Sequence, residues 1–141
     1  MAIEKIVVDA SVVAKWFLIE EHSEQAIALR DDYISGRVAL VAPSLLVYEV
    51  LNALKYSGVY SREEMEQIAE ALDRYGIDLR ELRGDLKKRA VGEAVARDLS
   101  LYDASYLALA EVLQARLYTA DEELVERGGG VAVHVREYEK S

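Results

Sequence analysis

Short apolar runs rich in β-branched residues recur along the chain and predict the strands of a sheet. The runs are bounded by polar or turn-forming residues. The predicted strands are residues 3–8, Val38–Ala42, Arg116–Thr119 and Val131–Val135. A further segment, Ile77–Leu82, is short and alternating, so it fits either an edge strand or a loop.

Between these runs, apolar residues recur at helical spacing, and several helix ends carry recognisable signals. The predicted helices are Val12–Leu18, Glu24–Ser35, 43–58, 61–76, Asp85–Asp98, Tyr102–Ala115 and Glu122–Arg127. Ser23 is expected to cap the second helix, and Ser61 forms a capping box with Glu64 at the fourth. Pro43 suits the first turn of its helix, and Gly58 suits the end of that helix.

Strands that alternate with helices indicate a parallel sheet covered on both faces. No linker, repeat or low-complexity tract divides residues 1–141, so we expect a single domain. The sequence therefore predicts an α/β fold, a three-layer α/β/α sandwich with a four- to five-stranded parallel sheet. In such sheets ligands bind beyond the carboxyl ends of the strands, near a switch in strand order.

The composition narrows the class of protein. A chain that is 52% hydrophobic and 30% charged suits a folded soluble domain rather than a disordered one. The absence of cysteine excludes disulfides, zinc–thiolate sites and thiol nucleophiles. No apolar stretch is long enough to span a bilayer and no signal peptide is recognisable, so we expect a cytoplasmic protein without a membrane partner. A net charge of −9 argues against binding duplex nucleic acid through a broad basic face.

Four carboxylates lie at the end of, or inside, segments that read as buried. They are Asp9, Glu49, Asp103 and Asp121. Charged side chains are rarely buried unless they are paired or bind a metal. Asp9 and Asp121 directly follow predicted strands, and Asp103 opens the helix that precedes the strand Arg116–Thr119. The topology therefore allows these acids to meet at the carboxyl edge of the sheet.

Taken one at a time, three of the acids also have ordinary structural explanations. Asp9 can cap the helix that follows it. Asp103 and Asp121 can complement the dipole of a helix N-terminus. None of the three therefore identifies a site on its own.

Glu49 is harder to explain in this way, because its helix is apolar on nearly every side. Glu49, Asn52 and Lys55 recur every three residues and can form one narrow polar stripe. In one interpretation the stripe is solvated and Lys55 neutralises Glu49. In the other, Glu49 is a ligand and Asn52 orients it or a water molecule.

Four carboxylates in one pocket repel one another and require either a cation or protonation. An all-oxygen ligand set favours Mg²⁺ or Mn²⁺ over zinc. Such a site can polarise a phosphodiester and activate a water molecule for in-line attack. The acids together therefore predict metal-dependent phosphodiester hydrolysis.

Other catalytic schemes have weaker support. His22 and His134 are isolated in the sequence, and no glycine-rich phosphate loop is present. Lys15 is a candidate phosphate contact, whereas Trp16 is more typical of a core residue. A phosphotransfer domain of the receiver type needs a lysine at the end of the last strand, and Val131–Val135 is followed by Arg-Glu-Tyr instead.

Four segments, in this order and at this spacing, resemble the four acidic motifs of the PIN domain, and most closely those of VapC-type toxins from prokaryotic toxin–antitoxin pairs. The segments are Val7–Ser11, Glu49–Asn52, Leu101–Ala110 and Leu117–Asp121. The resemblance extends from Ile3 to about Val135, nearly the whole chain. It implies a parallel-sheet α/β/α sandwich and Mg²⁺- or Mn²⁺-dependent endonucleolytic cleavage of single-stranded RNA.

The resemblance also implies roles for individual residues. Asp9 and Asp103 correspond to the principal metal ligands, and Glu49 and Asp121 complete the acidic quartet, directly or through waters. Supporting polar residues of the family fall at Ser11, Asn52 and Thr119.

VapC-type toxins usually form homodimers and are inhibited by a small VapB-like antitoxin, so the resemblance implies both kinds of partner. We therefore expect a metal-dependent endoribonuclease that is the toxin of a type II pair. Two alternatives stay open at this point. One is a PIN-type RNA-processing nuclease without an antitoxin, and the other is a non-catalytic module whose acidic pocket binds a partner.

Overall fold

A five-stranded parallel sheet forms the centre of the molecule. The structure, a computed structural model, describes residues 3–141. The strands are β1 (Glu4–Val8), β2 (Val38–Pro43), β3 (Asp78–Arg80), β4 (Arg116–Thr119) and β5 (Ala132–His134). Their order is β3-β2-β1-β4-β5, and all four pairings are parallel. The sequence-based prediction of an α/β fold with a parallel sheet is confirmed, and the segment at 77–82 contains an edge strand.

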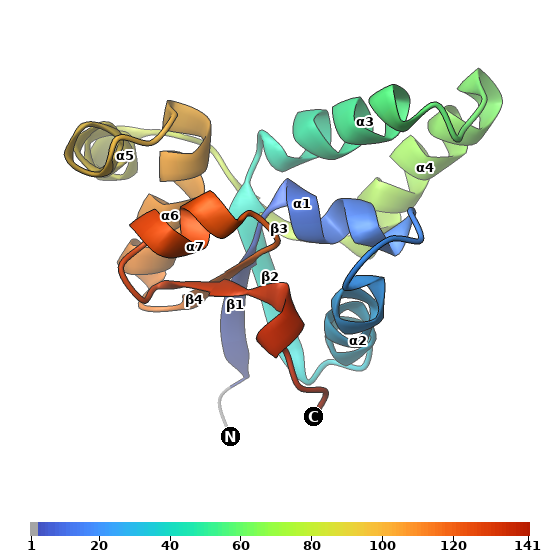
Figure 1. Ribbon diagram of the computed structural model, residues 1–141, viewed down its shortest axis with the longest axis horizontal. Helices are drawn as coiled ribbons and strands as arrows, with labels where there is room; N and C mark the ends of the chain where they lie inside the picture. Colours follow the sequence, from blue (N-terminus) through green and yellow to red (C-terminus); the bar gives the residue numbers. More distant parts are fainter. Residues whose placement is uncertain (1–2) are drawn as a thin grey trace.

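Within residues 3–141, seven α-helices and two short 3-10 helices lie between or after the strands. They are α1 (Ala10–Val13), η1 (Ala14–Trp16), α2 (Ser23–Ile34), α3 (Leu46–Ser57), α4 (Arg62–Tyr75), α5 (Gly84–Arg97), α6 (Leu101–Leu113), α7 (Glu122–Arg127) and η2 (Val135–Glu137). Helices α1 to α4 lie on one side of the sheet and α5 to α7 on the other, which gives three layers (Figure 1). Among residues 3–141, no helix combines the length and apolar character that crossing a membrane requires.

Several helix ends follow the predicted signals. The Ser61 side chain accepts a hydrogen bond from the backbone N–H of Glu64, and the Glu64 side chain accepts one from the N–H of Ser61. This reciprocal pair is the predicted capping box. Gly58 and Gly76 end α3 and α4 in the left-handed conformation, at φ of 70° and 65°, which glycine adopts without steric cost.

Two of the predicted helix starts are wrong. Pro43 ends β2 instead of opening a helix, and α3 begins at Leu46. Proline is tolerated there because its missing N–H falls at the end of the strand. Ser23 is the first residue of α2 and not its cap. Its hydroxyl donates to the carbonyl of Leu18 and accepts from the N–H of Glu20, so it fastens the preceding turn.

The core lies on both faces of the sheet. The central strand β1 contributes Ile6, Val7 and Val8, each with no exposed surface. Fully buried residues of this kind on a central parallel strand reflect the cover of helices on both faces. On one side α2 contacts β2, and on the other α6 contacts β1, β2 and β4.

The strand order changes direction between β1 and β4. The chain runs outward from β1 through β2 to β3, then returns to β4 beside β1. The carboxyl ends of β1 and β4 therefore lie at the switch in strand order, the place where open parallel sheets bind ligands. In Figure 1 this edge is the upper one, beside α1, α3 and α7.

Candidate functional site

Asp9 follows β1 directly and is held by three hydrogen bonds. Its Oδ1 accepts from the Ser11 hydroxyl at 2.6 Å and from the Val12 backbone N–H at 3.3 Å. Its Oδ2 accepts from the Thr119 hydroxyl at 2.5 Å. The residue is only 6% exposed and is the N-cap of α1. The capping role and a site at the sheet edge are thus compatible in one side chain.

The two hydroxyls that hold Asp9 are themselves fixed by the chain after β4. The Ala120 N–H donates to Ser11 Oγ at 2.8 Å, and the Asp121 N–H donates to Thr119 Oγ1 at 3.0 Å. Each hydroxyl accepts one backbone hydrogen bond and donates its own proton toward the carboxylate. The orientation of Asp9 therefore depends on both strands at the switch point.

The pKa of Asp9 is raised from 3.8 to about 6. Burial is the main cause, because removing a carboxylate from water disfavours its charged form. Hydrogen bonds from Ser11, Thr119 and Val12 counteract this effect, and the negative charge of Asp103 adds to it. Asp9 is therefore a buried acid with hydrogen-bond donors, and no cationic side chain of residues 3–141 is among the causes of its pKa shift.

Glu49 lies in the first turn of α3 and is partly buried. The hydroxyl of Tyr106 on α6 donates to Glu49 Oε1 at 2.7 Å. Tyr106 is 1% exposed, so this part-buried contact links a core side chain of α6 to the partly buried Glu49 of α3. Burial raises the pKa of Glu49, the Tyr106 hydrogen bond opposes the rise, and the charge of Asp103 adds to it.

Asp103 lies in the first turn of α6, where the Ser100 side chain caps the helix by accepting from the Asp103 N–H. Its pKa is raised by burial first, then by the negative charges of Asp121 and Glu123. Since the charge of Asp103 also raises the pKa values of Asp9 and Glu49, this residue is the electrostatic centre of the set.

Asp121 caps α7, and its Oδ1 accepts from the Glu123 N–H at 2.9 Å. The structure thus brings the four acids to one edge of the sheet, each from a different element. Asn52 lies one turn after Glu49 on α3 and is exposed. Both residues line the same hollow, whereas Ser11 and Thr119 contact Asp9.

Two lysines that seemed relevant in the sequence are engaged elsewhere. The prediction that Lys15 contacts phosphate is wrong, because Lys15 is buried. Its Nζ donates to the Glu21 carbonyl at 2.7 Å and to Glu20 Oε1 at 3.1 Å. Lys55 lies over the ring of Tyr56 at 5.3 Å from the centroid.

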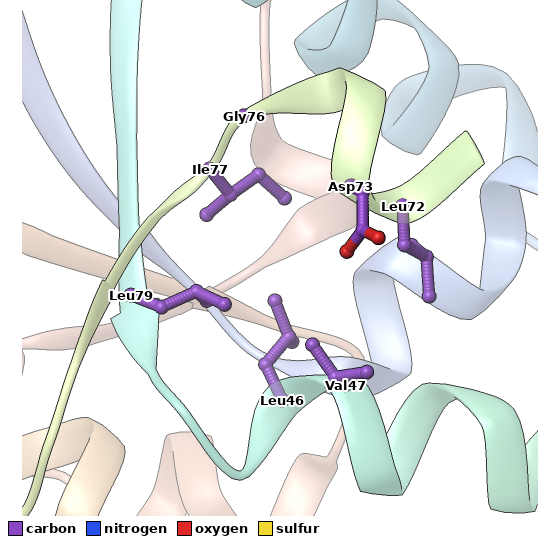
Figure 2. A pocket seen from close by; sticks show the side chains of 7 residues that line it. All are labelled: Leu46, Val47, Leu72, Asp73, Gly76, Ile77 and Leu79. Carbon is purple, nitrogen blue, oxygen red and sulfur yellow. The ribbon is translucent and has the colours of Figure 1, made fainter. Parts of the chain in front are cut away.

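Two hollows open near α3. The first has a volume of about 490 Å³ and is lined by Leu45, Tyr48, Glu49, Asn52 and Tyr102. The second, shown in Figure 2, is an apolar space of about 130 Å³ between α3, α4 and β3. The side chains of Leu46, Leu72, Ile77 and Leu79 point into it (Figure 2). Only the first hollow contains a residue of the acidic quartet, so it is the one relevant to chemistry.

A family model described as PIN domain matches residues 6–130, which include all four acids. The chain belongs to the PIN domain family. Ribonuclease VapC3 of Pyrobaculum aerophilum is 34% identical to this PIN domain over 127 residues, which cover 87% of this chain and 94% of the relative. The resemblance predicted from the acidic motifs is thereby confirmed.

Solved structures share the fold of this PIN domain. A toxin–antitoxin complex from Klebsiella pneumoniae aligns with a TM-score of 0.68 at 17% identity, over 92% of this chain and 97% of that one. VapC20 of Mycobacterium tuberculosis, described as a sarcin–ricin loop cleaving toxin, aligns with a TM-score of 0.68 at 18% identity, over 87% of this chain and 95% of that one. At identities this low, the similarity to these two structures shows a shared fold and no more.

The donor set of this PIN domain suits a hard divalent cation, because it consists of carboxylate oxygens. Every charged group that shifts the pKa values of Asp9, Glu49 and Asp103 is itself acidic. By contrast, buried Asp32 faces Arg37, which helps to lower its pKa. Within residues 3–141, no three His, Cys, Asp or Glu side chains form a ready ligand cluster.

Two residues of this region were not identified from the sequence. Tyr106 lies three residues after Asp103 in an apolar run, and a buried tyrosine needs a partner for its hydroxyl. That requirement was the available signal, but the sequence does not show which acceptor is near. Glu123 follows Asp121 by two residues, and its charge acts on Asp103.

Proposed function

We propose that this PIN domain is a Mg²⁺- or Mn²⁺-dependent endoribonuclease that cleaves single-stranded RNA. The observation that carries the proposal is the group of acids at the switch point whose pKa values are raised without a basic partner. Such a group attracts a divalent cation, and a bound cation can in turn hold a phosphodiester. The likeness to Ribonuclease VapC3 supports RNA as the substrate.

Asp9 and Asp103 would be the direct ligands of the cation. Asp9 is the more rigid of the two, since hydroxyls of Ser11 and Thr119 fix both of its oxygens. Glu49 and Asp121 would act from either side of this pair, on a second cation or on the water that attacks the phosphorus. A bound divalent cation supplies the Lewis acid that polarises the phosphodiester and lowers the pKa of water.

The protein's own side chains would orient the carboxylates of Asp9 and Glu49. Ser11 and Thr119 would hold the two Asp9 oxygens in place, and Tyr106 would hold Oε1 of Glu49. In-line attack on the phosphorus would leave a 5′-phosphate and a 3′-hydroxyl. Because no basic side chain of residues 3–141 is among the causes that shift the pKa values of Asp9, Glu49 and Asp103, negative charge on the substrate would be compensated by the cation.

We further propose that the protein is a toxin whose partner is a small VapB-like antitoxin. The shared fold with a chain of a toxin–antitoxin complex supports this assignment. An antitoxin that presents a basic side chain to the acids would replace the cation and block the site. We also expect the toxin to form a homodimer, as VapC-type proteins usually do.

The nuclease proposal is tested with single-stranded RNA in Mg²⁺ or Mn²⁺. Wild type should cleave the RNA, and Asp9→Asn and Asp103→Asn should lose most of this activity. Asp85→Asn is the matched control, because Asp85 is an exposed acid in the first turn of the neighbouring helix α5. Equal cleavage by wild type and both active-site variants would indicate a contaminating nuclease and reject the proposal.

A further inference from the structure

The hollow beside the acids has two exposed aromatic walls. Tyr48 comes from α3 and is 79% exposed, and Tyr102 comes from the start of α6 and is 64% exposed. Glu49 and Asn52 lie in the same lining. The hollow therefore contains one residue of the acidic quartet, Glu49, and Tyr102 in its lining immediately precedes a second, Asp103.

Neither tyrosine is needed for the core. Helix α3 buries Leu46, Val50 and Leu54, and Tyr48 lies outside that face. The buried part of α6 begins after Tyr102, which immediately precedes Asp103. Large aromatic side chains left in solvent beside a reactive centre are unfavourable for solubility and are typical of binding surfaces.

The chemistry of the lining suits an unpaired nucleobase. Aromatic faces stack with any base, and the amide of Asn52 offers both a donor and an acceptor to a base edge. A volume of about 490 Å³ lies within the usual range for small-ligand sites. The carboxylate of Glu49 disfavours a phosphate inside the hollow, so a nucleotide would enter with its base while its phosphate stays at the cation.

We propose that this hollow binds an unpaired base of the RNA next to the cleaved phosphate, stacked on Tyr48 and Tyr102 and hydrogen-bonded by Asn52. The proposal rests on the proposed nuclease function and adds a site that selects single strands, because a base within a duplex is not free to enter. The two walls belong to α3 and α6, the helices joined by the Tyr106–Glu49 hydrogen bond. The contact that holds Glu49 therefore also links the two helices that carry Tyr48 and Tyr102.

The test compares Tyr48→Leu and Tyr102→Leu with the conservative Tyr48→Phe and Tyr102→Phe. Loss of one stacking contact should raise the KM for single-stranded RNA by roughly 5- to 150-fold, while kcat stays near that of wild type. The phenylalanine variants should retain wild-type KM. Tyr56→Leu is the matched control, since Tyr56 lies on the same helix, is 77% exposed and does not line the hollow.

A substrate change separates stacking from an indirect effect. After the cleavage position is mapped, an abasic nucleotide is placed on each side of it in turn. At one of these positions the abasic substitution should raise the KM of wild type as much as Tyr48→Leu does. In the Tyr48→Leu variant, the same abasic substrate should raise the KM no further. Additive losses, or leucine variants that bind and cleave like wild type, would overturn the proposal.

The proposed nuclease function can fail separately. If wild type does not cleave, fluorescence anisotropy with a labelled single-stranded RNA in Mg²⁺ still decides, because binding should weaken in the leucine variants and not in Tyr56→Leu. If RNA binding is unchanged in all variants and only inhibition by a protein partner is lost, the hollow receives that partner and the base-binding proposal is rejected.

Discussion

The hydroxyl of Tyr106 donates a 2.7 Å hydrogen bond to Oε1 of Glu49 and thereby links α6 to α3. We predict that Tyr106→Phe lowers the cleavage rate about tenfold, in line with a hydrogen bond to a charged group. Since this hydrogen bond lowers the pKa of Glu49, its loss should move the acidic limb of the pH–rate profile to higher pH. The measurement is kcat against pH at saturating Mg²⁺.

Tyr33→Phe is the control for this prediction. Tyr33 donates a 2.7 Å hydrogen bond to the Tyr75 carbonyl, so its variant loses a contact of similar length away from the acids. The two variants should lose similar stability, but only Tyr106→Phe should shift the pH profile. An identical shift in both would show that the effect is structural.

Thr119 connects Asp9 to the backbone after β4, and Thr119→Val removes this connection at nearly constant volume. The variant leaves the Asp121 N–H without its acceptor and Asp9 Oδ2 without its donor. We expect a loss of about 1–3 kcal/mol in the free energy of unfolding. We also expect a higher Mg²⁺ concentration for half-maximal activity near pH 6, because Asp9 then holds its proton more tightly. Thr119→Ser should retain both properties, and its failure to do so would implicate the methyl group instead.

Burial of Asp9 makes the metal-free protein less stable as the pH rises. The pKa of Asp9 is about 6 in the folded protein and 3.8 in the unfolded chain. Between pH 3.8 and about 6, the folded state therefore binds this proton more strongly than the unfolded chain does. The associated stability is present below pH 3.8 and is lost as the pH rises through about 6, with a magnitude of about 3 kcal/mol. Asp9→Asn should therefore raise the melting temperature at pH 8 in EDTA, whereas Asp85→Asn should not. A lower melting temperature for Asp9→Asn would contradict this account.

Divalent cations should restore the stability that the wild-type protein loses as the pH rises. Mg²⁺ or Mn²⁺ at 100 times its dissociation constant stabilises the folded state by about 2.7 kcal/mol. The melting temperature of wild type should rise on addition of either cation, and Asp9→Asn and Asp103→Asn should respond weakly or not at all. Differential scanning fluorimetry in matched ionic strength measures this directly. A wild-type protein that is insensitive to both cations would favour a pocket that binds a partner without catalysis.

Local signals in the sequence predicted much of the fold. Alternating strands and helices, the Ser61 capping box and the glycine at 58 depend on neighbours within a few residues, and the structure confirms them. The predicted roles of Pro43 and Ser23 at helix starts are wrong because both residue types occur at helix starts and also in neighbouring positions. Pro43 ends β2, and Ser23 is the first residue of α2. Tertiary packing decides between these positions, and no local pattern records it.

The candidate site was predictable to a similar extent. Acids that directly follow strands must lie at the carboxyl edge of a parallel sheet, so the location of Asp9 and Asp121 follows from topology. The partnership of Tyr106 with Glu49 spans 57 positions and depends on how α3 and α6 approach each other. The prediction that Lys15 contacts phosphate is wrong because it also depends on tertiary packing. The Nζ of Lys15 donates hydrogen bonds to the Glu20 side chain and the Glu21 carbonyl.

The placement of β4 beside β1 has a consequence for biosynthesis. Asp9 leaves the ribosome together with Ser11 and Val12, but the Thr119 hydroxyl and the backbone groups of residues 120 and 121 that complete its orientation are synthesised much later. A nascent chain that ends before β4 has an unpaired edge on β1 and lacks one of the four acids. The acidic centre therefore cannot be complete before residues 119 to 121 have been synthesised, and a shorter nascent chain carries an incomplete site.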